Sequence, residues 1–352
     1  MLTEKDVLFT CSYLPEEIVI AAGFRPVRVI SGARPSDADT AIHPTTCPYI
    51  RAVFAATARG DNAAAAGTVI VNSCDGIRRL YDALAARRGG PPVVFLDVPH
   101  KSDADAVDLF AGGLRRLAGQ LQKELGGAPV TPSSLEKAIV HTNSLRRKMA
   151  GVFAAQADGM LSGGAVFSLL ADTATGDLRD GGGRIDKLLA DARGKSASAG
   201  KRVVVSANVL DRPDLVGMIE GAGGSVVALD TCVGARHWEG LVAEGSPDPM
   251  RAVAERYLTR PACPRMEGIG RRIDWLVSLA RDSRADGVIL CSVKYCDAWL
   301  YDLPLLTEEM ERAGVRVLSI ENDYEWSGAG QTKTRIEAFV ETLRQGGAQC
   351  SN

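Results

Sequence analysis

The sequence lacks several features that mark common classes of protein. It has no excess of charge of one sign: 41 basic and 43 acidic residues among 352 give a formal net charge of -2, so nothing indicates a nucleic-acid footprint. No segment approaches the roughly 18–20 consecutive apolar residues that a membrane-spanning helix needs. The N-terminus also lacks the basic start and apolar stretch of a secretory signal. We therefore expect a cytoplasmic protein that binds neither nucleic acid nor membrane.

Sequence motifs of several enzyme classes are missing as well. There is no CxxC pair, which leaves a zinc ribbon or a thioredoxin-type site with little support. There is no G-x-x-x-x-G-K-[ST] phosphate loop, so ATP chemistry is not expected on this chain. The glycines at 181–183 follow no expected strand, and they therefore do not match a dinucleotide-binding fingerprint.

What the sequence does contain is an alternation of strand-like and helix-like segments. Hydrophobic residues make up 46% of the chain and charged residues 24%, which allows a large buried core. Continuous apolar strands between amphipathic helices indicate parallel sheets covered on both faces. The expected strands are 26–30, 67–72 and 92–98 in the first half, and 201–207, 224–230, 287–293 and 315–321 in the second.

Helical segments separate these strands and fill the middle of the chain. The middle, from about Thr131 to Ala192, shows helical periodicity without a strand; Ser133 or Ser134 is the candidate N-cap, and a glycine cluster at 181–183 interrupts it. We expect these middle helices to connect or cover the sheets. The other expected helices are 15–23, 47–58, 76–86, 104–124, 213–221, 249–258, 268–281, 304–313 and 332–344.

The expected fold class is therefore α/β, with two doubly wound parallel-sheet domains and a helical middle segment. Residues 1–195 are expected to form the N-terminal α/β domain together with the helical segment. Residues 196–352 are expected to form the C-terminal α/β domain.

The positions of the eight cysteines carry the functional information. Disulfides are a poor explanation in a reducing cytosol. Cys74, Cys232 and Cys296 each follow an expected strand, and Cys11 closes the short apolar run VLFT. This placement matters because ligands of open parallel sheets bind outside the carboxyl ends of the strands.

Two further cysteines, Cys47 and Cys263, are each followed by proline. Pro48 marks the first turn of a helix, whose positive end favours a thiolate. Cys291 lies inside an expected strand and is interpreted as a buried hydrophobe, while Cys350 is interpreted as a free residue of the tail. For the other six cysteines, the residues alone leave a metal or cluster site and plain burial equally open.

The cysteine segments together resemble the 2-hydroxyacyl-CoA dehydratase and benzoyl-CoA reductase family of iron–sulfur subunits. The resemblance implies two α/β domains with a cluster between them, and Cys47, Cys74 and Cys296 match the usual ligands of one [4Fe-4S] cluster. A further three thiols at Cys11, Cys232 and Cys263 imply the branch that binds a double-cubane [8Fe-9S] cluster; a single [4Fe-4S] cluster is the alternative. The segments that carry the resemblance are CSYLPEEIVIAAGFRPVRV, HPTTCPYIR, VNSCDGIRRLYD, FLDVPHK, LDTCVGARHW, ERYLTRPACPRM, SVKYCDAWLYDLPLL and TRIEAFVE.

The resemblance also implies partners and a reaction class. Family members receive low-potential electrons from a separate ATP-hydrolysing iron–sulfur activator and reduce a small molecule. We expect such an oxidoreductase component, acting as a homodimer. Two alternatives stay open: a dehydratase or aryl-CoA reductase subunit acting on a CoA thioester, and a non-catalytic electron-relay protein.

Several polar residues are further candidates for the site. His100 follows an expected strand and is either a proton donor near the site or a solvent-exposed loop residue. Lys294, two residues before Cys296, either pairs with an anionic cluster or is exposed. Asp75 and Asp297, each directly after a cysteine, either raise electron density near the cluster or cap the following helices.

Overall fold

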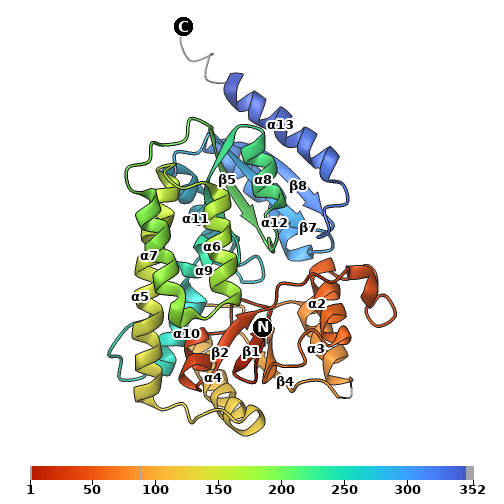
Figure 1. The fold of residues 1–352 in the computed structure, drawn as a ribbon, viewed down its shortest axis with the longest axis vertical. Helices are drawn as coiled ribbons and strands as arrows, with labels where there is room; N and C mark the ends of the chain where they lie inside the picture. The colour runs from red at the N-terminus through yellow and green to blue at the C-terminus, as the bar shows by residue number, and fades with distance from the viewer. Residues whose placement is uncertain (1, 88, 346–352) are drawn as a thin grey trace.

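Two four-stranded parallel sheets form the frame of the protein in the computed structural model, which describes residues 2–87 and 89–345 (Figure 1). The strand orders are β2-β1-β3-β4 and β6-β5-β7-β8, and all neighbouring strands run parallel. The expected α/β class is thus confirmed, and the seven expected strands form with ends within two residues of the prediction. The strands are β1 (Asp6–Phe9), β2 (Arg25–Arg28), β3 (Gly67–Asn72), β4 (Val93–Asp97), β5 (Lys201–Ala207), β6 (Gly224–Asp230), β7 (Gly287–Val293) and β8 (Arg316–Asn322).

Helices cover the faces of both sheets. Within the described residues, no helix combines the length and the apolar character needed to cross a membrane. The α-helices are α1 (Glu16–Ala21), α2 (Pro48–Arg59), α3 (Asp75–Ala85), α4 (Ala104–Leu125), α5 (Pro132–Ala157), α6 (Gly163–Thr175), α7 (Gly181–Ala192), α8 (Asp214–Gly221), α9 (Ala235–Trp238), α10 (Pro249–Thr259), α11 (Ile269–Asp282), α12 (Asp297–Arg312) and α13 (Ala329–Gln345), and the 3₁₀ helices are η1 (Pro35–Ala38) and η2 (Leu178–Asp180).

Successive side chains of the first sheet enter two different cores. Val69 and Val71 of β3 belong to the core that contains α1 and α4, whereas Ile70 belongs to the core that contains α2 and α3. Because side chains alternate across a strand, both faces of an apolar strand need a helical cover. The unbroken apolar run of β3 therefore dictates a sheet between two helical layers.

The second sheet repeats this arrangement. Val203 and Val205 of β5 pack in the core that contains α6, α8 and α13, and Val204 packs in the core that contains α11 and α12. The order of the strands is also the same in both sheets, with the second strand at one edge and the first and third strands in the middle. In each sheet the strand order reverses between the two middle strands, because successive strands are added first towards one edge and then towards the other. This switch point is the place where open parallel sheets bind ligands.

The middle segment is helical as expected, with two differences at its ends. Thr131, and not Ser133 or Ser134, is the N-cap of α5: its hydroxyl accepts from the Ser134 amide at 3.1 Å while the Ser134 hydroxyl accepts from the Thr131 amide at 3.0 Å. The glycines 181–183 form the first turn of α7 and do not interrupt the helices. Burial of Ile185 between α7 and its neighbours overrides the low helix propensity of glycine there.

Helix α12 begins earlier than the expected segment 304–313. It starts at Asp297 and contains Pro304 in its interior. Proline removes one N–H from the helical ladder and usually marks a helix end, which explains the wrong prediction. Trp299, Leu306 and Met310 are buried at helical spacing, and this packing keeps the turns before the proline helical.

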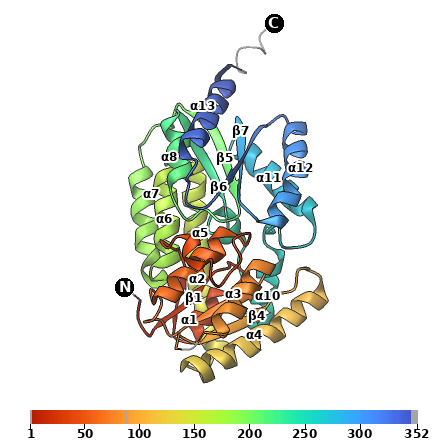
Figure 2. The same cartoon turned by 90° about the vertical axis from the view of Figure 1, so that its right-hand side faces the viewer.

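Several helices near the middle of the chain pack against the sheet that the other half of the chain forms. Residues of α5, α6 and α7 pack in the core of the second sheet, whereas α10 packs beside α4 in the core of the first sheet (Figure 2). The division into residues 1–195 and 196–352 stays a prediction. The packing shows that each half of the chain contributes a helical cover to the sheet of the other half.

A buried ion pair ties three helices together at this crossing. Glu17 of α1 is fully buried and accepts from Arg146 of α5 at 2.5 Å, from Thr142 of α5 at 3.0 Å and from Tyr257 of α10 at 3.0 Å. Burial alone would raise the pKa of Glu17, but Arg146 and Arg256 outweigh it and lower the pKa from 4.5 to about 2. The carboxylate is therefore charged in the folded protein and holds α1 against α5 and α10.

Glu17→Gln should destabilise the protein by about 3–5 kcal/mol at pH 7, because the buried Arg146 guanidinium loses its carboxylate. Since the folded-state pKa lies below the ordinary value, this stabilisation is fully present above pH 4.5 and is lost as the pH falls towards 2. Thermal unfolding from pH 7 to pH 3 should thus show a weaker pH dependence in the variant. The exposed Glu4→Gln is the matched control; equal melting temperatures for both variants would contradict the prediction.

Candidate functional site

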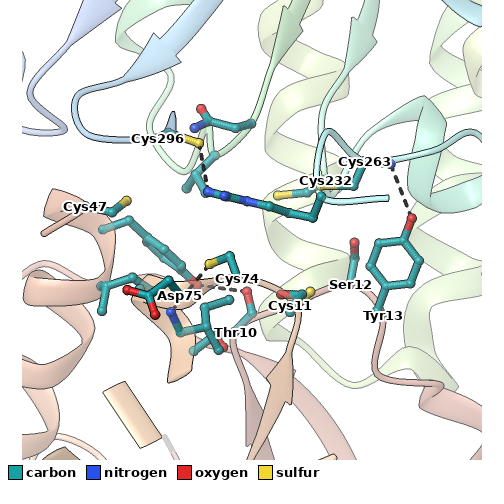
Figure 3. Close-up of a pocket in the computed structure, with 18 of the residues that line it drawn as sticks. Thr10, Cys11, Ser12, Tyr13, Cys47, Cys74, Asp75, Cys232, Cys263 and Cys296 are labelled. Atoms are coloured by element: carbon teal, nitrogen blue, oxygen red, sulfur yellow. Dashed lines mark hydrogen bonds between the residues drawn. The ribbon is translucent and has the colours of Figure 1, made fainter. Parts of the chain in front are cut away.

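A cavity of about 300 Å³ lies where the carboxyl ends of both sheets meet (Figure 3). Its walls include residues directly after β1 and β3 of the first sheet and after β5, β6 and β7 of the second. The middle strands of both sheets thus end at the same cavity. The two sites that the fold favours for ligands are joined into one.

Six free cysteines line this cavity. They are the six thiols singled out in the sequence: Cys11, Cys47, Cys74, Cys232, Cys263 and Cys296. Cys291 is buried inside β7, where its sulfur accepts from Asn322 at 3.2 Å, and it does not line the cavity. Cys350 lies outside the described residues. The structure therefore brings the six together, and their role as ligands stays a prediction.

Three of these cysteines occupy helix N-termini. Cys47, Cys74 and Cys296 are the N-cap residues of α2, α3 and α12. The Cys74 sulfur accepts a hydrogen bond from the Ile77 amide at 3.4 Å. Free amides and the positive end of a helix dipole favour a thiolate at such a position.

The other three cysteines lie in loops. Cys11 follows β1, Cys232 follows β6, and Cys263 lies between α10 and α11. The Cys263 amide donates to the Tyr13 hydroxyl at 3.2 Å (Figure 3). Irregular backbone of this kind leaves the sulfurs free to face the cavity.

The cysteine positions repeat between the two halves of the chain. A Cys-Pro pair precedes the helix that leads to the third strand, at Cys47 before α2 and at Cys263 before α11. A second cysteine follows the third strand itself, at Cys74 after β3 and at Cys296 after β7. The same local design thus supplies thiols from both sheets.

Electrostatic contacts gather the thiols into two groups of three, which also touch each other because the charge of Cys263 raises the pKa of Cys74. The first group is Cys47, Cys74 and Cys296: burial, followed by the charges of Cys296 and Cys74, raises the pKa of Cys47 to about 12. The second group is Cys11, Cys232 and Cys263, in which the pKa values of Cys11 and Cys232 are raised by burial and then by Cys263. Each group draws thiols from both halves of the chain. In Figure 3, Cys47 and Cys296 lie on one side of the view, Cys232 and Cys263 on the other, and Cys74 and Cys11 between them.

A protein with these raised pKa values holds neutral thiols at pH 7 unless a cation replaces the protons. Coordination to a metal removes the proton of a thiol outright. Among the described residues, no three His, Cys, Asp or Glu side chains lie close enough to share a single metal ion. Thiolates that ligate different irons of one cluster lie farther apart than the ligands of one ion.

The arginines of the cavity wall were not predicted from the sequence. Arg28 donates to the Cys232 sulfur at 3.1 Å, and Arg265 donates to the Cys296 sulfur at 3.3 Å. Arg236 and Arg260 line the same cavity. The spacing R-P-A-C-P-R around Cys263 was an available signal for Arg260 and Arg265, whereas Arg28 ends a strand and carried none.

The other polar candidates lie differently from the cysteines. His100 and Lys294 are exposed and do not line the cavity, so the structure does not support catalytic roles for them. Asp75 and Asp297 do line it, in the first turns of α3 and α12. Their interpretation as helix caps is wrong, because the preceding cysteine is the N-cap in both helices.

Comparisons with known proteins show the family of this chain. Residues 11–343 match the family described as 2-hydroxyglutaryl-CoA dehydratase, D-component. The chain is 25% identical to the (R)-phenyllactyl-CoA dehydratase beta subunit of Clostridium sporogenes and to the lactoyl-CoA dehydratase subunit beta of Anaerotignum propionicum. It is 22% identical to the (R)-2-hydroxyglutaryl-CoA dehydratase subunit beta of Acidaminococcus fermentans. Each of these alignments covers 94% of this chain and 90% of the relative.

The match spans nearly all of the described residues, from the first cavity cysteine to the last helix. The resemblance inferred from the cysteine segments is confirmed at the level of the family, and its double-cubane branch stays a prediction. The chain belongs to the 2-hydroxyglutaryl-CoA dehydratase D-component family.

Proposed function

We propose that this chain is an iron–sulfur redox component that uses the six cavity cysteines to hold a cluster for the reduction of a small molecule. The observation that carries the proposal is the convergence of Cys11, Cys47, Cys74, Cys232, Cys263 and Cys296 on one cavity from segments spread over most of the chain. Buried cysteines without a common function have no reason to share one wall.

The chemistry of the cavity supports a cluster over other occupants. Thiolates are soft ligands that select iron–sulfur clusters, copper(I) and zinc. Helix N-termini and arginines beside the sulfurs offset the negative charge of a thiolate-bound cluster. The volume of about 300 Å³ leaves room for more than one metal ion.

The division of the thiols into two groups of three supports a double-cubane [8Fe-9S] cluster, with one group for each cubane. When bound, a cluster of this kind supplies one-electron reduction at low potential. The residues of the chain hold the cluster, exclude water and set its potential. Electrons would come from a separate ATP-hydrolysing iron–sulfur activator, since the sequence contains no phosphate loop.

A second candidate is a dehydratase subunit with a single [4Fe-4S] cluster on Cys47, Cys74 and Cys296. The names of the relatives favour it, because they are dehydratase subunits for phenyllactyl-CoA, lactoyl-CoA and 2-hydroxyglutaryl-CoA. The substrate would then be a 2-hydroxyacyl-CoA thioester. In both candidates we propose a small-molecule substrate, and for the first a homodimer.

Protein purified without oxygen should be brown and contain about eight iron atoms per chain if the double cubane is bound, and about four if one cubane is bound. Iron and acid-labile sulfide analysis measures both. Cys291→Ala is the control, because this thiol lies outside the cavity and should leave the iron content unchanged. A colourless, iron-free preparation would refute the proposal.

Serine substitutions should separate the two cysteine groups. Cys47→Ser and Cys11→Ser are each expected to lower the iron content by about half in the double-cubane protein, because each removes one of three ligands from one cubane. With a single cubane, Cys47→Ser abolishes iron binding and Cys11→Ser changes nothing. Iron per chain and the visible absorbance of the variants distinguish these results.

The reaction class is tested on the iron-loaded protein. Reduced with titanium(III) citrate, a dehydratase should convert lactoyl-CoA or phenyllactyl-CoA to the unsaturated thioester, and omission of the reductant should abolish the conversion. A reductase should instead consume reducing equivalents in proportion to substrate. An iron-loaded protein that turns over none of the substrates offered would contradict a reductase that acts as a homodimer and support the electron-relay alternative.

A further inference from the structure

We propose that Arg28 and Arg265 are positioning residues for the bound cluster, each holding one cysteine group through a hydrogen bond to a sulfur. The inference rests on the proposed iron–sulfur function. It adds the residues that set the charge and the reduction potential at each group.

Arg28 is a buried cation whose hydrogen-bonding capacity is largely unused. It lies at the end of β2, is 2% exposed, and has a hydrogen bond only to the Cys232 sulfur in the part of the chain that the structure describes. Its Nε and Nη1 atoms are buried without a partner. Each unsatisfied buried donor costs about 1–3 kcal/mol, so these groups are explained by an anionic occupant of the cavity that Arg28 lines.

No carboxylate in the described residues forms an ion pair with Arg28 within 4.0 Å. The buried carboxyl of Asp211 acts on Arg28 through its charge from beyond that distance. A guanidinium keeps its proton in proteins, so Arg28 is cationic. Its hydrogen-bond acceptor among the described residues is the sulfur of Cys232, in the second cysteine group.

Arg265 serves the first cysteine group in the same way. It is partly exposed, and its Nη2 atom donates to the Cys296 sulfur at 3.3 Å. This is its only hydrogen bond among the described residues, and it has no ion pair there. Arg265 follows Cys263 by two residues, so a single loop ligates one group and supports the other.

The two other arginines of the cavity wall have structural partners instead. Arg236 pairs with Asp230 at 3.0 Å and donates to the Ala207 carbonyl. Arg260 donates to the Ser12 carbonyl at 2.7 Å. Of the four guanidiniums, those of Arg28 and Arg265 alone have cysteine sulfur as their hydrogen-bond acceptor within the described ranges.

A hydrogen bond from a cation to a ligand sulfur favours the more negative, reduced state of a cluster. Removal of the cation should therefore lower the midpoint potential. The ratio of reduced to oxidised protein at a fixed potential should fall by about tenfold, since a charge-assisted hydrogen bond is stronger in the more negative state. Because Arg265 is more exposed than Arg28, the midpoint potential at the first group should depend more strongly on salt concentration than that at the second group.

The experiment compares Arg28→Gln, Arg28→Lys, Arg265→Gln and Arg265→Lys with the unaltered protein, all loaded with iron without oxygen. Iron per chain is measured first, and an anaerobic redox titration followed by absorbance and electron paramagnetic resonance then gives the midpoint potentials. The matched control is Arg51→Gln, since Arg51 is a buried arginine whose guanidinium pairs with Asp39 and donates to no cysteine sulfur. Its potentials should equal those of the unaltered protein.

The glutamine variants should titrate at lower potential, and the lysine variants should recover part of the difference because they keep the charge. If Arg28→Gln does not fold, Arg28→Lys and the Arg265 pair carry the test. Fully loaded variants with unchanged potentials and unchanged spectra would overturn the inference while leaving the proposed function intact. An unaltered protein without iron would overturn the proposed function itself.

Discussion

The organisation of this protein depends on a conflict between burial and charge at the cysteines. Burial raises the pKa of Cys47 to about 12 and that of Cys11 to about 11, so these thiols resist ionisation, while Arg28 beside them keeps donors without acceptors. The side chains of the described residues satisfy neither the buried thiols nor the unpaired donors of Arg28. The proposed cluster would satisfy both, because iron would replace the thiol protons and the arginines would face the resulting negative charge.

The strand order determines where in the fold this cavity forms. Both sheets have the same order of strands, and in both this order reverses between the two middle strands. Facing the two carboxyl edges towards each other merges two ordinary ligand sites into one cavity with walls from both sheets. The hydrogen bonds of Glu17 stabilise this arrangement, because they join α1 to α5 and α10 at the crossing of the two halves.

The strands and the cavity cysteines were predictable because their signals are local. Apolar runs define the strands, and a cysteine at the end of a parallel strand is at the ligand edge in any open sheet. The early start of α12 was missed because burial of Trp299 and Met310 outweighs Pro304. Arg28 was missed for a different reason: its meaning arises from Cys232, which lies 204 residues later in the chain. His100 and Lys294 also follow strands, yet both point to solvent, since strand ends fix the backbone and not the direction of a long side chain.

The composition of the two cysteine groups has a consequence for biosynthesis. The first group is completed by Cys296 and the second by Cys263, so neither set of three exists until more than two thirds of the polypeptide has left the ribosome. The nascent N-terminal sheet presents Cys11, Cys47 and Cys74, which belong to different groups. Insertion of the proposed cluster would therefore be a late maturation event that requires both sheets to have formed.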